Sequence, residues 1–155
     1  MNYLPGWASS KTIIVDANIA ANAVLPLESA SRYLSFFERW RSEEVALFAP
    51  AFWIAEVTSV IRQYAYRKMI SQSQARRAVK DFYLLDVEIL PLDEELCIQA
   101  LDWAEKIQHS KIYDSLYLAL SERLGAEFWT SDKKLTNAAH AAGAQWVHWV
   151  GDVAE

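Results

Sequence analysis

Four carboxylate residues stand where the sequence changes from one expected secondary-structure element to the next. They are Asp16, Glu56, Asp114 and Asp132. Acidic side chains gathered in one cleft repel one another and are costly to desolvate, so a fold that gathers them usually holds a cation between them. Ligation by oxygen atoms alone suits Mg²⁺ or Mn²⁺. The four residues therefore predict a divalent-metal site, provided that the fold brings them together.

Each carboxylate also has a simpler interpretation. Asp16 and Asp132 each precede an expected helix, where an aspartate can cap the free N–H groups of the first turn, and Ser131 is a competing cap for the second helix. Glu56 lies off the apolar stripe of its helix, which is typical of a solvated surface residue. Asp114 opens an apolar helix, so the alternative there is a buried ion pair with an Arg or a Lys.

The elements expected around these residues alternate between strands and helices. Apolar and β-branched runs predict strands at 12–15, 46–48, 87–92, 126–130 and 145–149. Helical spacing and cap residues predict helices at 16–25, 29–44, 51–68, 71–86, 93–108, 112–124 and 133–142. This order predicts an α/β protein with a mostly parallel central sheet in a three-layer α/β/α arrangement. Ligands bind at the carboxyl ends of such strands, where Asp16 and Asp132 are expected.

Composition restricts the class of protein further. The 155 residues favour one domain, which we place at 12–150 after an irregular lead-in at 1–11. The net charge of −5 argues against a generally basic nucleic-acid binder but leaves room for a local basic rim. With one cysteine, Cys97, and no apolar run long enough for a bilayer, we expect no membrane association and a cytoplasmic location.

Four short motifs carry a family resemblance over about 12–149. They are IIVDAN at 13–18, AEV at 55–57 with SVI at 59–61, YDSLYLAL at 113–120 and TSDKKL at 130–135. In their order and spacing the chain resembles the PIN-domain ribonucleases, in particular the VapC-type toxins of VapBC toxin–antitoxin systems.

The resemblance implies a fold, a metal site and partners. It implies a PIN-like domain in which all four carboxylates bind Mg²⁺ (or Mn²⁺) and catalyse hydrolysis of RNA, with Asn18 and Thr130 supporting them. It also implies a homodimer and inhibition by a VapB-type antitoxin, whose Arg or Lys could replace the metal among the carboxylates. The sequence leaves open whether Glu56 binds metal or accepts a proton from the attacking water.

RNA needs positive charge near an acidic site. Candidates for an RNA-binding rim are Arg62, Lys111, Lys133 and Lys134, with Arg67 and Lys68 beside them. Lys133 and Lys134 follow Asp132 directly, at a helix start where a cation opposes the helix dipole. The alternative is that they form an ordinary solvated first turn. We interpret Arg76, Arg77 and Lys80 as a solvated helix face.

Three other functions remain as alternatives to a toxin ribonuclease. The first is a housekeeping PIN nuclease in RNA processing, and the second is a non-catalytic binding module on the same fold. The third is a phosphatase of the dehalogenase type, which would need a second aspartate where this chain has Asn18.

Overall fold

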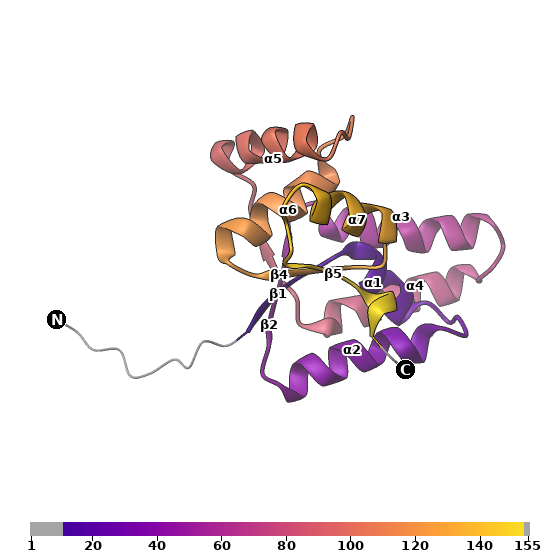
Figure 1. The fold of residues 1–155 in the computed structure, drawn as a ribbon. Helices are drawn as coiled ribbons and strands as arrows, with labels where there is room; N and C mark the ends of the chain where they lie inside the picture. The colour runs from indigo at the N-terminus through magenta and orange to yellow at the C-terminus, as the bar shows by residue number, and fades with distance from the viewer. Residues whose placement is uncertain (1–10, 154–155) are drawn as a thin grey trace.

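The computed structural model describes residues 11–153, which form a five-stranded parallel sheet between two layers of helices (Figure 1). The strands are β1 (Thr12–Val15), β2 (Ala46–Pro50), β3 (Glu88–Leu90), β4 (Glu127–Thr130) and β5 (Val147–Trp149). The α-helices are α1 (Ala17–Val24), α2 (Ala30–Ser42), α3 (Trp53–Tyr66), α4 (Gln72–Phe82), α5 (Glu94–Lys106), α6 (Tyr113–Leu124) and α7 (Lys133–Ala141). The predicted three-layer fold is confirmed, while the predicted lead-in at 1–11 lies outside the described residues except for Lys11.

The sheet order is β3-β2-β1-β4-β5, and every pairing between neighbours is parallel. Consecutive side chains of β4 point to opposite layers. Phe128 stacks on Tyr117 of α6 with ring centres 5.1 Å apart, whereas Trp129 packs against Trp40 of α2 at 5.8 Å. A strand buried on both faces needs apolar residues at consecutive positions, which explains the unbroken apolar run of β1.

Local signals account for most helix boundaries. Ser71 and Gln74 form a capping box at the start of α4, and α6 ends at Gly125, whose φ of +59° suits a residue without a Cβ. The predicted helix 71–86 is too long, because α4 stops at Phe82 and a short 3₁₀ turn, Tyr83–Leu85, follows. That turn ends in a left-handed residue, Asp86, which redirects the chain into β3.

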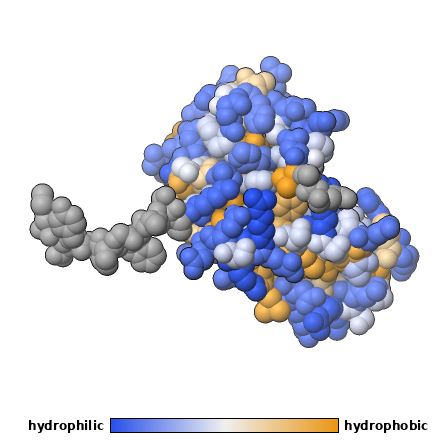
Figure 2. Space-filling view, turned by 60° about the horizontal axis from the view of Figure 1, so that its bottom comes forward, coloured by the Kyte–Doolittle hydropathy of each residue, from blue (hydrophilic) through white to orange (hydrophobic). Residues whose placement is uncertain are grey.

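The core lies on both faces of the sheet. Trp40, Trp53 and Trp103 are at most 4% exposed and belong to this core. The surface seen in Figure 2 is mainly hydrophilic, with scattered hydrophobic patches. Within residues 11–153, we find no helix that combines the length and the apolar character needed to cross a bilayer.

Candidate active site

The sheet topology brings two of the four carboxylates together. Its strand order reverses between β1 and β4, so the chain leaves these adjacent strands in different directions and opens a crevice at their carboxyl ends. Asp16 follows β1 directly and caps α1, while Asp132 stands after β4 and caps α7. The helix-cap interpretation is thus correct for both residues, and it is compatible with a role in the site.

Thr130, the last residue of β4, links these two aspartates. Its Oγ1 donates a hydrogen bond to Asp16 Oδ2 over 2.6 Å and accepts one from the backbone N–H of Asp132 over 3.0 Å. The Thr130 side chain is fully buried, so no water competes for these bonds. The residue predicted to support the carboxylates therefore lies in direct contact with one of them and with the backbone of another.

Asp16 is the most buried of the four carboxylates, with 5% of its surface exposed. Burial raises its pKa to about 6, and the charges of Asp114 and Asp132 act in the same direction, while the Thr130 bond opposes them. The backbone N–H of Asn18 donates to Asp16 Oδ1 over 3.4 Å. Asn18 is exposed, and it contacts Asp16 through its backbone rather than through its side chain.

Glu56 approaches the same place from the first turn of α3. It is half-buried, and its Oε1 is enclosed without any hydrogen-bond partner. Burial raises the pKa of Glu56 to about 7, with further contributions from the charges of Asp16 and Asp114. The alternative of a solvated surface residue is wrong, because a solvated carboxylate would have both oxygens in water. The sequence pattern correctly placed Glu56 off the core stripe but could not reveal that Asp16 and Asp114, from other segments, lie near enough to interact with its charge.

Asp114 lies in the first turn of α6, with 40% of its side chain exposed. Burial raises its pKa and the charge of Asp132 adds to this, whereas the His109 imidazole, 3.4 Å away, holds the pKa down. The alternative of a buried pair with Arg or Lys is wrong, since the nearest partner is His109. The sequence analysis did not single out His109, which lies in the loop before α6, with three residues between it and the first residue of that helix.

Tyr117 is a second residue of the site that sequence reasoning did not single out. Its ring is 1% exposed, and its hydroxyl oxygen accepts a hydrogen bond of 3.3 Å from the N–H of Ala17. Burial raises its pKa well above the ordinary value, and the charges of Asp16 and Glu56 raise it further. The Tyr117 hydroxyl therefore lies beneath the carboxylates and fixes the first turn of α1, which carries Asp16.

The four carboxylates form one electrostatic unit. Asp16 interacts with each of the other three, and Asp114 interacts with Glu56 and with Asp132. Within residues 11–153, none of the four makes an ion pair with an Arg or a Lys. All four stand at or in the first turn of a helix, whose free N–H groups favour negative charge. In this described part of the chain, the one ion-pair contact of the cluster is that of Asp114 with the His109 imidazole, 3.4 Å away.

The donor set fits a hydrated hard cation. In the described part of the chain, no three His, Cys, Asp or Glu side chains are arranged so that they alone could hold a metal ion. Mg²⁺ does not need such a cage, because it usually keeps several waters and uses one or two carboxylates. The Oδ oxygens of Asp16, Asp114 and Asp132 are ligands of the kind that such an ion prefers, and Oε1 of Glu56 is enclosed near them without a hydrogen-bond partner.

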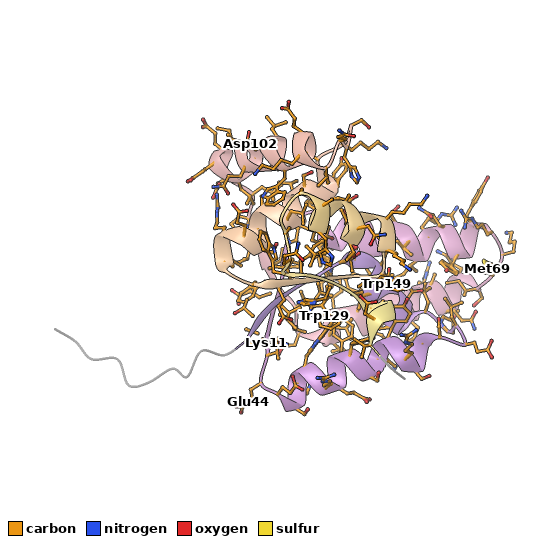
Figure 3. All side chains as sticks on the ribbon, viewed as in Figure 1. Lys11, Glu44, Met69, Asp102, Trp129 and Trp149 are labelled. Atoms are coloured by element: carbon orange, nitrogen blue, oxygen red, sulfur yellow. The ribbon has the colours of Figure 1, made fainter. Side chains whose placement is uncertain are left out.

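The predicted rim residues occupy different places around the site. Lys133, directly after Asp132 in the chain, extends over the ring of Trp149 (labelled in Figure 3) at 4.7 Å, and Lys134 follows it and is exposed. Lys111 lines a hollow of about 440 Å³ that also includes His109 and Asp114.

The fourth rim residue, Arg62, lies farther away. It covers the ring of Tyr66 at 5.5 Å and lines a groove between α3 and α4. The helix turns by about 100° per residue, so Arg62 points about 120° away from Glu56 around α3. Its role in RNA binding remains a prediction, as do those of the three lysines.

Comparison with protein families gave one match, to the model described as PIN domain, over residues 13–141. The chain belongs to the PIN-domain family. Membership supports a nuclease function for this PIN domain. Comparison with curated proteins gave no match.

Solved structures share the fold of this PIN domain. PAE2754 from Pyrobaculum aerophilum is 19% identical with a TM-score of 0.66, covering 92% of each chain. A toxin–antitoxin complex from Klebsiella pneumoniae is 17% identical with a TM-score of 0.60, covering 91% of this chain and 99% of that one. The Mycobacterium tuberculosis toxin VapC20, described as cleaving the sarcin–ricin loop, is 15% identical with a TM-score of 0.59, covering 81% and 94%.

Proposed function

We propose that this PIN domain is a divalent-metal-dependent endoribonuclease that hydrolyses RNA phosphodiester bonds and acts as the toxin of a toxin–antitoxin pair. The observation that carries the proposal is the gathering of four carboxylates, contributed by four separate segments, at the carboxyl ends of β1 and β4 without an Arg or Lys partner in residues 11–153. Such a cluster is electrostatically costly on its own, and a bound divalent cation removes the cost.

The carboxylates have different roles in this proposal. Asp16, Asp114 and Asp132 would hold the metal, which when bound would lower the pKa of a water molecule and neutralise negative charge on the phosphoryl oxygens. Thr130 keeps one oxygen of Asp16 oriented, and the cap bond from Leu135 N–H, 3.0 Å from Asp132 Oδ1, orients Asp132. Glu56, with a pKa of about 7, is suited to accept a proton from the attacking water near neutral pH.

Two further features of the proposal concern partners. Similar structures are described as toxin–antitoxin complexes, which supports a VapB-type antitoxin as inhibitor of this chain. A homodimer is the proposed assembly, and exposed apolar side chains such as Leu84 (72%) and Leu101 (60%) provide contact area for one. Sedimentation velocity on the purified chain tests the dimer, and a single monomer species at micromolar concentration would refute it.

The central test compares the wild type with Asp16→Asn. Asparagine caps a helix about as well as aspartate and can still accept the Thr130 bond, so the variant should fold normally. We expect it to lose metal-dependent cleavage of RNA, as wild type does in excess EDTA. Asp102→Asn, on the exposed face of the outer helix α5 (labelled in Figure 3), is the matched control and should cleave normally. Equal cleavage by wild type and Asp16→Asn, or cleavage that resists EDTA, would refute the mechanism.

The toxin assignment has its own test. Expression of the wild type should arrest bacterial growth, and expression of the folded Asp16→Asn variant should not. If neither the wild type nor the variant affected growth, although the wild type cleaves RNA in vitro, a housekeeping nuclease would be favoured instead.

A further inference from the structure

Positive charge is concentrated in one part of an acidic chain. Residues 57–80 contain six of the fifteen Lys and Arg residues and none of the twenty Asp and Glu residues, a formal charge of +6 in a chain of −5. The six are Arg62, Arg67, Lys68, Arg76, Arg77 and Lys80, and all are exposed. They lie on the hairpin formed by α3 and α4, which projects from the sheet on the right of Figure 1, with Met69 labelled at its tip in Figure 3.

One face of α3 connects the carboxylate cluster to the tip of this hairpin. At about 100° per residue, positions 7 and 11 residues after Glu56 lie on the same face of the helix. These positions are Gln63 and Arg67, and both are exposed. At 1.5 Å per residue, Arg67 stands about 16 Å from Glu56 along the helix axis. Arg67 is the C-cap of α3, and Lys68 follows it.

The chemistry of this face suits single-stranded nucleic acid. Between Glu56 and Arg67 it presents the exposed polar side chains of Ser59 and Gln63 and one half-buried apolar side chain, Val60, whereas a groove-binding protein helix would need a stripe of several apolar anchors. Tyr66, beside the stripe, is 73% exposed. Exposed aromatic rings flanked by cations are the usual platform for stacking unpaired bases.

We propose that the RNA substrate runs from the carboxylate cluster along this face of α3, with Arg67 and Lys68 holding its phosphates and Tyr66 stacking on a base. This track rests on the proposed ribonuclease function and extends it to the nucleotides that flank the cleavage site. At about 3.4 Å per stacked nucleotide, the distance from Glu56 to Arg67 accommodates about five nucleotides.

The other basic residues of the hairpin provide a matched control. The groove between α3 and α4, of about 160 Å³, is lined by Ala65 and Thr58, which lie about 180° and 160° around α3 from Glu56. The helix α4 therefore lies on the far side of α3 from the proposed track. Arg77, which pairs with Asp81 at 2.9 Å, and Lys80 are both on α4.

The experiment measures binding separately from cleavage. Fluorescence anisotropy with a 15-nucleotide single-stranded RNA is recorded in an Asp16→Asn background, in Mg²⁺ buffer and over a salt series. We expect Arg67→Gln/Lys68→Gln to weaken binding about tenfold and to reduce the salt dependence by about 1.4 in log–log slope, since each phosphate contact contributes about 0.7. Tyr66→Ala should weaken binding at least fivefold without changing that slope.

The control is Arg77→Gln/Lys80→Gln, which removes the same charge from the same hairpin and should change affinity less than twofold. Equal weakening by both double variants would mean that only total charge matters and would overturn the track. The track would also be overturned if Arg67→Gln/Lys68→Gln lost the dimer in sedimentation velocity but kept its affinity for RNA. The surface would then be a contact between two copies of the chain. Failure of the wild type to cleave RNA would instead refute the proposed function, which separates the two outcomes.

Discussion

Replacing Thr130 by Val tests whether the buried hydroxyl stabilises the ionised form of Asp16. Valine has nearly the same shape but cannot donate to Asp16 Oδ2 or accept from the N–H of Asp132. Losing the bond to Asp16 Oδ2 destabilises the protein only when Asp16 is ionised. Losing the bond from the N–H of Asp132 destabilises it equally at every pH. The pH dependence of stability therefore isolates the bond to the carboxylate.

The size of the pH-dependent change in stability follows from the pKa of Asp16, which burial raises from 3.8 to about 6. Because the folded protein binds this proton more tightly than the unfolded chain, the free energy of unfolding falls as pH rises from about 4 to about 6. A hydrogen bond to a charged group is worth about 1.5–3 kcal/mol. Loss of the Thr130 bond therefore raises the pKa of Asp16 in the folded state by a further one to two units, at about 1.36 kcal/mol per unit. In Thr130→Val the free energy of unfolding should then keep falling up to about pH 7–8.

The assay is urea unfolding of the metal-free protein in EDTA at pH 4 and pH 8. We expect Thr130→Val to be destabilised by about 1 kcal/mol at pH 4, from the unpaired N–H, and by about 1.5–3 kcal/mol more at pH 8. Thr130→Ser keeps the hydroxyl and serves as the control, with a pH dependence like that of the wild type. A Thr130→Val variant destabilised equally at both pH values would refute the reasoning.

Three further predictions concern neighbouring groups. Glu56→Gln removes a carboxylate whose pKa is about 7, so at pH 8 it should raise the melting temperature of the metal-free protein. We expect a rise of about 2–4 °C, which corresponds to about 1 kcal/mol in a domain of this size after allowance for solvent screening. An unchanged or lower melting temperature in calorimetry would contradict this prediction. Mg²⁺ at one hundred times its Kd should stabilise the wild type by about 2.7 kcal/mol but Asp16→Asn much less, and equal shifts would place the ion elsewhere. Tyr117→Phe leaves the Ala17 N–H unpaired and should lower the free energy of unfolding by about 1–3 kcal/mol, while no change in urea would mean that water replaces the hydroxyl.

Much of the fold could be predicted because its signals are local. The apolar run before Asp16 and the capping pair Ser71 and Gln74 each depend on a few consecutive residues. The order of the strands is different, because it depends on which helix packs on which face. Sequence alternation predicted parallel strands, but only the structure places β4 beside β1 and so puts Thr130 between the two aspartates.

The same distinction applies to the candidate site. The four carboxylates could be selected by type and by motif, since their spacing along the chain resembles that of a known family. His109 could not, because its contact with Asp114 depends on the path of the loop before α6. The burial of Glu56 Oε1 also depends on neighbours from other segments, which a helical pattern does not contain.

The bond between Thr130 and Asp16 also depends on the register in which β1 and β4 pair. These strands pair with Val15 opposite Trp129, and the next residues of each strand, Asp16 and Thr130, meet through the hydroxyl. A slip of one residue would turn every side chain of the strand to the opposite face and would put Trp129 or Ser131 in the place of Thr130. Misaligned molecules would thus lose core packing and the arrangement of their acidic groups in the same event. A misaligned form would be unstable, because it would lack the packed core. We therefore expect the activity per folded molecule to be the same in different preparations.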